Sequence, residues 1–400
     1  GSKAANPFDF LMTTASASQQ LYCARQYARQ EYPAKPAPLW QGEIYRHQRI
    51  RIAYLSADYY NHATAYLMAE LFARHDQRRF ETIAISFGPN PQDVMRQRME
   101  GLFSRFIDVR ERSDQEIALL LRELEIDIAV DLKGYTRDSR MGILAYRPAP
   151  VQVNYLGYPG TLGADYIDYI IADRHLIPPG HEPYYQEQVV RLPDSYQVND
   201  RQRLVAPDTP SRAQAGLPEQ GFVFCSFNNH YKLTPEVFAV WMRLLARVPG
   251  SVLWQLCDNP LAITNLQQQA QLHGIDPVRL VFAGRMSSPL HLARQRLADL
   301  FLDTLPCNAH TTASDALWMG LPLLTCQGDA FVGRVASSLL HAAGVPELVT
   351  HSLAEYEARA LQLATEPARL AALKARLLAQ RDRCALFDTD RYCRHLESAY

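Results

Sequence analysis

Leu305-Pro306-Cys307-Asn308-Ala309-His310-Thr311-Thr312-Ala313-Ser314-Asp315 is the stretch on which the interpretation of the whole chain depends. The apolar run before it, residues 298–303, predicts a buried strand. The run after it, residues 316–320, predicts a helix that ends on a glycine. The stretch therefore marks a junction where a strand passes into a helix.

Three consecutive polar residues, His310, Thr311 and Thr312, lie at this junction. Unpaired amide N–H groups and the positive end of the helix dipole favour an anion such as a phosphate there. Asp315, one turn into the helix, is placed to accept a hydrogen bond from a sugar hydroxyl. A purely structural interpretation stays open, with an N-cap threonine, a surface histidine and a helix-surface aspartate.

The composition is that of an ordinary globular protein. Hydrophobic residues make up 48% of the 400 residues and charged residues 21%, with a net charge of −1. This length predicts two domains, and the near-zero charge gives no indication of nucleic acid or of a membrane surface as a partner. No apolar run reaches transmembrane length and no signal peptide is visible.

The seven cysteines show no paired spacing, and several lie in apolar, strand-like runs. This usage predicts reduced thiols and a cytoplasmic protein. No set of cysteines and histidines has the spacing of a zinc site. The opening residues, 1–3, include no methionine and resemble an expression scar, so we expect a longer natural gene product.

Two successive α/β halves are predicted from the alternation of strand and helix patterns along the chain. We expect a helical preface over 1–48, a first Rossmann-like domain over 49–205, a second over 206–375 and C-terminal helices over 376–400. A polar, proline-bearing lapse at residues 192–218 contains the boundary. Such sheets are mostly parallel and bind ligands beyond the carboxyl ends of their strands, so the site is expected in a cleft between the facing halves.

Two common nucleotide-binding fingerprints are missing from the sequence. Neither half has G-x-G-x-x-G after its first strand, which argues against a nicotinamide or flavin enzyme. The chain also lacks G-x-x-x-x-G-K-[ST], so no P-loop is expected.

The first strand of each half is followed by residues able to do chemistry. His62 follows the first strand of the first half and suits a general acid or base, or an oxyanion donor. Asn229 and Lys232 follow the matching strand of the second half, where a lysine suits a diphosphate leaving group. The alternatives are a loop histidine and a solvated lysine.

Two further turns are candidates for ligand contact. Gly157 and Pro159 lie in a glycine-proline turn after a strand, where a ligand can approach the backbone closely or where the chain simply turns. Residues 286–288 and His291 follow another strand, where the imidazole can stack on a nucleobase. Ser288 is also expected to cap the following helix, with Pro289 at its first position.

Several motifs, in order, resemble the catalytic region of the O-GlcNAc transferases and their bacterial relatives over about residues 45–400. The resemblance rests on ADYYNHAT at 57–64, KGYT at 133–136, RPAPVQ at 147–152, LGYPGT at 156–161, FNNHYK at 227–232 and CNAHTTASD at 307–315. The related O-fucosyltransferases lack the His-Thr-Thr-x-x-Asp form, which favours a UDP-sugar over GDP-fucose.

The resemblance implies a GT-B fold and an inverting, metal-independent transfer of N-acetylglucosamine from UDP-GlcNAc to Ser or Thr hydroxyls of protein or peptide acceptors. His62 matches the active-site histidine near acceptor and sugar, and Lys232 matches the lysine on the diphosphate. No cofactor is expected. The tetratricopeptide repeats usual in the family are represented by only one helical segment.

The nucleotide contacts are also carried over by resemblance, with two departures. Asn229 stands where some members have glutamine, and Ser288 where some have lysine. The implied contacts are His291 stacking on uracil, with Met286, Ser287 and Ser288 alongside, His310, Thr311 and Thr312 on the phosphates, and Asp315 on the ribose.

Two other classes of function remain open. One is a GT-B transferase with another donor, such as UDP-glucose, or another acceptor: asparagine, a glycan or a lipid. The other is a UDP-binding scaffold without turnover. A screen of donor hydrolysis separates these classes.

Overall fold

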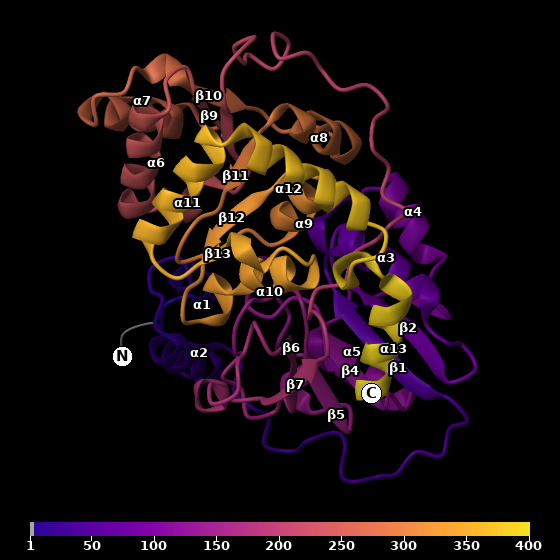
Figure 1. Ribbon diagram of the computed structural model, residues 1–400. Helices are drawn as coiled ribbons and strands as arrows, with labels where there is room; N and C mark the ends of the chain where they lie inside the picture. Colours follow the sequence, from indigo (N-terminus) through magenta and orange to yellow (C-terminus); the bar gives the residue numbers. More distant parts are fainter. Residues whose placement is uncertain (1–3) are drawn as a thin grey trace. The chain divides into compact units, whose positions relative to one another are not determined.

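The computed structural model describes residues 4–400, so residues 1–3 lie outside the description. The chain forms two compact units (Figure 1). The first comprises residues 4–201 and 385–400, and the second comprises 202–384. The expected boundary at 205/206 stays a prediction, and the structure adds that the last sixteen residues belong with the first unit.

The first unit is built on a seven-stranded, all-parallel sheet with strand order β3-β2-β1-β4-β5-β6-β7. Its strands are β1 (Ile50–Ser56), β2 (Phe80–Ser86), β3 (Arg105–Asp108), β4 (Ile128–Asp131), β5 (Val151–Asn154), β6 (Tyr169–Asp173) and β7 (Gln188–Leu192). Its helices are α1 (Pro7–Phe10), α2 (Ala17–Glu31), α3 (Ala63–Arg74), α4 (Val94–Glu100), α5 (Asp114–Glu123) and α13 (Thr389–Ala399). The strand order reverses between β1 and β4.

The second unit repeats this plan with a six-stranded parallel sheet of order β10-β9-β8-β11-β12-β13. Its strands are β8 (Val223–Ser226), β9 (Val252–Leu256), β10 (Leu280–Ala283), β11 (Leu300–Leu302), β12 (Leu323–Cys326) and β13 (Val349–Thr350). Its helices are α6 (Pro235–Arg247), α7 (Pro260–Leu272), α8 (Ser288–Arg294), α9 (Thr311–Trp318), α10 (Val335–Ala342), α11 (Leu353–Thr365) and α12 (Pro367–Gln380). Here the strand order reverses between β8 and β11.

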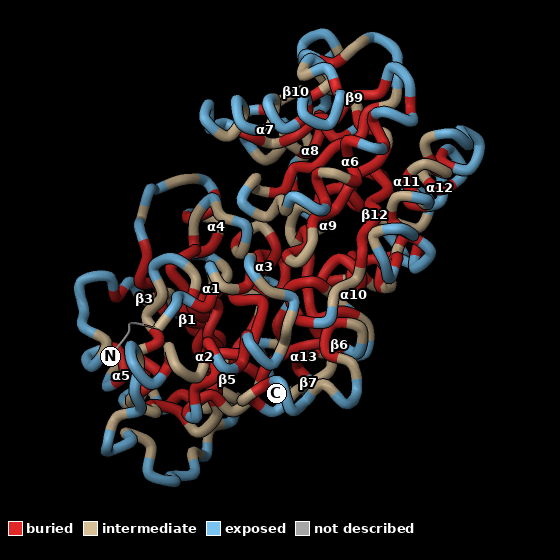
Figure 2. Tube along the Cα trace, turned by 90° about the vertical axis from the view of Figure 1, so that its left-hand side faces the viewer, coloured by how far each residue is buried: buried red, intermediate tan, exposed pale blue. Residues whose placement is uncertain are grey.

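These topologies confirm the expected pair of Rossmann-like sheets. In both units the central strands are nearly continuous in burial, as parallel strands covered on both faces require, whereas the edge strands β3 and β7 are largely not buried (Figure 2). Two short edge strands, β7 and β13, were not predicted, because edge strands carry little of the continuous apolar signal that marks the centre of a sheet.

Local capping explains where several helices begin. Ser113 and Glu116 form a capping box at the start of α5, and Thr234 caps α6. The expectation for Ser288 was wrong: α8 begins at Ser288, its N-cap is Ser287, and that side chain makes no capping hydrogen bond.

The C-terminal helix α13 returns to the first unit, where it packs beside α3 (Figure 1). The described cysteines are all free thiols, in agreement with the expected absence of disulfides. Among residues 4–400, no helix combines the length and the apolar character needed to cross a membrane.

Candidate active site

The junction between β11 and α9 in the second unit brings Lys232 close to the start of α9. Lys232 lies in a short 3-10 turn just after β8, and its Nζ donates to the carbonyl oxygen of Asn308 at 2.8 Å. Asn308 is fully buried, two residues before the junction histidine His310. Strands β8 and β11 are neighbours at the point where the strand order reverses, which is where open α/β sheets bind ligands.

The first turn of α9 leaves two amide groups available to a ligand. Within residues 4–400, the N–H groups of Thr311 and Thr312 have no acceptor, whereas those of Ala313 and Ser314 bond to the carbonyl of His310. The alternative of an N-cap threonine is not found, because His310 is the N-cap and makes no side-chain capping bond. A lysine charge and free amides are groups that suit an anion, so phosphate binding at this junction stays a prediction.

The threonine hydroxyl of Thr312 fixes a neighbouring amide instead of standing free. Its Oγ1 donates to Asn228 Oδ1 at 2.6 Å, and Asn228 Nδ2 donates to Thr304 Oγ1 at 2.8 Å. Asn228 therefore ties the end of β8 to the loop that follows β11.

His310 has a buried Nε2 atom that finds no partner among the described residues. Burial, and next the charge of Lys232, hold the pKa of His310 well below its usual range, so the ring is neutral. A hydrogen bond with the backbone of Val332 acts to raise the pKa of His310, so the partner is a carbonyl oxygen that accepts from a ring N–H. Because Nε2 has no partner within residues 4–400, this ring donor is Nδ1. Nε2 is then a bare acceptor that fits a ligand hydroxyl.

A buried aspartate, Asp303, organises the loop between β11 and α9. Its carboxylate accepts hydrogen bonds from the amides of Thr304 at 2.8 Å and Ala309 at 2.6 Å, and from Thr325 Oγ1 at 2.7 Å. Burial raises the pKa of Asp303 to about 6. Asp303 shapes the turn that presents the free amides.

The expected nucleobase site contains His291 on α8, whose ring centroid lies 5.2 Å from that of Phe227. Arg294 donates from Nη2 to His291 Nδ1 at 2.7 Å, and its guanidinium lies 4.9 Å from the Phe227 centroid. Burial lowers the pKa of His291 to about 4, so the ring is neutral near pH 7. A neutral flat ring beside an aromatic and a guanidinium suits a stacked base.

The predicted ribose contact, Asp315, is buried and forms an ion pair with Arg203 Nη1. Arg203 is also buried, and its Nε and Nη2 atoms have no partner within residues 4–400. No pattern in the sequence points to Arg203, which lies in the polar segment between the two sheets.

The remaining nucleotide candidates of the second unit are more exposed. Met286 and Ser287 are exposed, and Ser288 is half-buried at the start of α8. Asn229 is half-buried, and its Oδ1 accepts from Arg285 Nη2 at 3.1 Å. Arg285 in turn pairs with Asp258 at 3.0 Å. The side chain of Asn229, which is shorter than the glutamine of some family members, is therefore held by an arginine that follows β10.

His62 lies in the first unit at the end of β1, where it is the N-cap of α3. Its Nδ1 accepts from the amide of Thr64 at 3.2 Å. Burial, opposed by the charge of Asp58, lowers the pKa of His62 and favours the neutral ring. With Nδ1 engaged as an acceptor, the ring proton is on Nε2, which makes that atom a hydrogen-bond donor.

A buried ion pair between Lys133 and Asp58 lies next to His62. Lys133 Nζ, just after β4, donates to Asp58 Oδ2 at 2.7 Å, and the same oxygen lies 3.5 Å from His62 Nδ1. Both partners are nearly inaccessible to solvent. Asp58 and Lys133 each stand in a quoted motif, but no role was predicted for either residue, because their pairing joins segments 75 residues apart.

The glycine-proline turn has a structural reason for its glycine. A Cβ on Gly157 would lie 1.8 Å from the carbonyl oxygen of Leu132, so the turn needs glycine to pass β4 closely. Pro159 is buried, and Gly157 is half-buried. Their contact with a sugar stays a prediction.

Comparison with known proteins places the chain in a family. The sequence profile of Glycosyl transferase family 41 matches residues 33–209 and 206–396. The chain belongs to this family.

Among curated family 41 proteins, a probable UDP-N-acetylglucosamine–peptide N-acetylglucosaminyltransferase, SEC of Arabidopsis thaliana, is 38% identical over 88% of the chain. The corresponding Caenorhabditis elegans enzyme is 28% identical, also over 88%. The chain spans only 37% and 40% of the length of these two relatives.

Among solved structures, a mutant O-GlcNAc transferase of Thermobaculum terrenum matches with a TM-score of 0.86 and 32% identity, covering 96% of this chain and 73% of that one. Anabaena HepE in complex with UDP and glucose matches with a TM-score of 0.61 at 13% identity, covering 88% of this chain and all of that one, which shows a shared fold alone. These neighbours confirm the GT-B fold class expected from the sequence.

Proposed function

We propose that this family 41 chain is an inverting glycosyltransferase that moves N-acetylglucosamine from UDP-GlcNAc to Ser or Thr hydroxyls of proteins. The observation that carries the proposal is the junction of Lys232 with the free amides of Thr311 and Thr312 at the switch point of the second sheet. The donor and the acceptor class are supported by the names of the relatives.

In this mechanism the second unit binds the donor. The uracil stacks on His291, a ribose hydroxyl donates to Asp315, and the diphosphate lies on the first turn of α9. When the bond from C1 of the sugar to the phosphate oxygen breaks, negative charge grows on the diphosphate. Lys232 and the two amides are already placed to stabilise it, and such preorganised groups can be worth about 10²–10³ in rate.

The same residues support metal independence. A departing nucleoside diphosphate needs positive charge and N–H donors, and this chain supplies both from its own backbone and from Lys232. We therefore propose that no divalent cation takes part in the transfer.

The first unit supplies His62 to the reaction. With its proton on Nε2, the neutral ring donates a hydrogen bond and can orient the acceptor or a sugar oxygen. Removal of the acceptor proton by Nε2 would require the other tautomer, with Nδ1 turned to Asp58 at the longer distance of 3.5 Å. We propose a positioning role for His62.

The cellular setting is proposed from the thiols. All seven cysteines are free, and six of them are buried. Reduced, unpaired thiols are typical of the cytoplasm, where we place the transfer.

The test is mass spectrometry of a cell lysate incubated with the chain and UDP-GlcNAc in the presence of EDTA. We expect a HexNAc mass on Ser or Thr residues of lysate proteins. The variant Lys232→Ala should lose this modification. Its matched control is Lys374→Ala, because Lys374 lies in the same unit but bonds to Asp299 at 3.0 Å. Tight UDP binding without any modification would move the search to other donors and acceptors, or to a binding role without turnover.

A further inference from the structure

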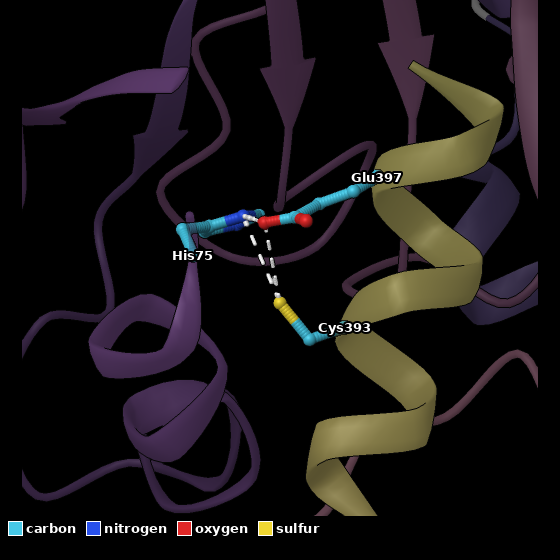
Figure 3. Close-up of side chains that lie close together, drawn as sticks. All are labelled: His75, Cys393 and Glu397. Carbon is cyan, nitrogen blue, oxygen red and sulfur yellow. Dashed lines mark hydrogen bonds and ion pairs between the residues drawn. The ribbon is translucent and has the colours of Figure 1, made fainter. Parts of the chain in front are cut away.

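A buried cluster of one histidine, one cysteine and one glutamate lies in the first unit, outside the residues assigned to the transfer. His75 is the C-cap residue directly after α3, whereas Cys393 and Glu397 lie one turn apart on α13. Figure 3 shows the three side chains pointing toward one another. One ligand atom from each lies within 4.8 Å of the others.

The distances between these atoms are close to those of a tetrahedral zinc site. His75 Nδ1 lies 3.0 Å from Glu397 Oε1, Cys393 Sγ lies 3.4 Å from the same oxygen, and Sγ lies 4.0 Å from Nδ1. Zinc bonds to N, O and S ligands at tetrahedral angles place such atoms about 3.3–3.6 Å apart. Shifts of a few tenths of an ångström therefore suffice.

The surroundings supply the supporting contacts that metal ligands usually have. His75 Nε2 lies 2.8 Å from the hydroxyl of Tyr54, which fixes the ring and leaves Nδ1 for the cluster. Glu397 Oε1 also accepts from the amide of Asp76 at 2.8 Å. The three cluster residues are each more than nine-tenths buried, so a bound ion would be protected from competing solvent.

We propose that His75, Cys393 and Glu397 bind one Zn²⁺ ion that ties the C-terminal helix to the first unit. Three protein ligands leave the fourth position for water or for the second carboxylate oxygen. On binding, the thiol of Cys393 releases its proton to solvent, and the ring proton of neutral His75 moves from Nδ1 to Nε2, where the Tyr54 hydroxyl can accept it. Sequence spacing carries no hint of the site, because His75 and Cys393 are 318 residues apart.

The test measures zinc in the purified full chain after EDTA treatment, reloading with Zn²⁺ and gel filtration. We expect about one ion per chain in the wild type and in the control Cys384→Ser, a half-buried cysteine outside the cluster. In Cys393→Ser, retained zinc should fall to background. Zinc should also raise the Tm of the wild type by about 5 °C or more, because it binds the folded state alone.

Cobalt provides a readout that does not depend on any variant folding. Co²⁺ at the site should give a near-ultraviolet thiolate-to-cobalt band and the intense visible bands of a tetrahedral ion. If the wild type retains no zinc, or if Cys393→Ser retains as much as the control, the proposal is overturned. A Co²⁺ spectrum without a thiolate band overturns it as well, and the cluster is then a hydrogen-bonded triad.

Discussion

Arg203 and Asp315 form a buried ion pair within the second unit, although they lie 112 residues apart in the sequence. Arg203 comes from the segment that precedes the second sheet, and Asp315 from α9. The pair orients the carboxylate that we assign to the ribose. The Nε and Nη2 atoms of Arg203 are buried and have no partner within residues 4–400, so the charge of this guanidinium is directed to Asp315 alone among the described contacts.

Replacing Arg203 by Gln should weaken UDP binding by about 10–100-fold, because a charged hydrogen bond to a buried carboxylate is lost. Calorimetric titration with UDP and with 2′,3′-dideoxy-UDP measures this. The preference for UDP over the dideoxy analogue should shrink together with the affinity. Arg296→Gln, the loss of an exposed arginine of the same unit, is the control. An unaltered preference in Arg203→Gln would show that the pair does not orient a ribose contact.

Two substitutions of His62 should distinguish its role as the N-cap of α3 from its role in the reaction. Asparagine is a good N-cap, so His62→Asn should keep the Tm near that of the wild type while turnover falls about 100-fold. His62→Ala should lose the same turnover and, in addition, about 1 kcal/mol of stability. Steady-state kcat and thermal unfolding measure both quantities. Full activity in the well-folded His62→Asn variant would remove His62 from the reaction.

The histidine His291 should make stability fall as the pH falls. Its pKa is about 4 in the folded chain and near the ordinary value of 6.5 in the unfolded chain. Between these values the unfolded state binds more protons, so the free energy of unfolding decreases from about pH 6.5 toward pH 4. His310 acts with the same sign. In urea unfolding over this range, His291→Gln should show a shallower dependence, and an identical slope would contradict the buried neutral ring.

UDP binding should tolerate asparagine at position 303 but not alanine. In Asp303→Asn, one oxygen can still accept from the amides of Thr304 and Ala309, and the new NH₂ can donate to the Thr325 hydroxyl. Asp303→Ala leaves these buried N–H groups unpaired, at a cost of about 1–3 kcal/mol for each. We expect UDP binding to survive in Asp303→Asn and to be lost in Asp303→Ala. Equal binding by both variants would show that Asp303 does not shape the turn.

Much of the fold and several site residues could be predicted because their signals are local. An apolar run that stops at polar residues marks the end of a strand, and in a parallel sheet the strand ends gather at one edge. This logic led to Lys232 and His310, which the structure brings together through Asn308. It also led to His62, at the matching edge of the first unit.

The residues that were missed act through partners distant in the sequence. Arg203 lies in a polar segment with no periodic pattern, and its proposed role follows only from its ion pair with Asp315. The pair of Asp58 and Lys133, and the return of α13 to His75, likewise depend on which segments fold against each other. Periodicity and motif spacing carry no information about such pairings.

The proposed mechanism depends above all on Lys232, which stabilises the departing diphosphate. The measurement is kcat for GlcNAc transfer by Lys232→Ala beside Lys374→Ala, with folding checked by thermal unfolding. Charge stabilisation that grows as the bond breaks predicts a loss of about 10²–10³-fold in kcat for Lys232→Ala and little change for Lys374→Ala. An unchanged kcat in a well-folded Lys232→Ala variant would contradict this mechanism.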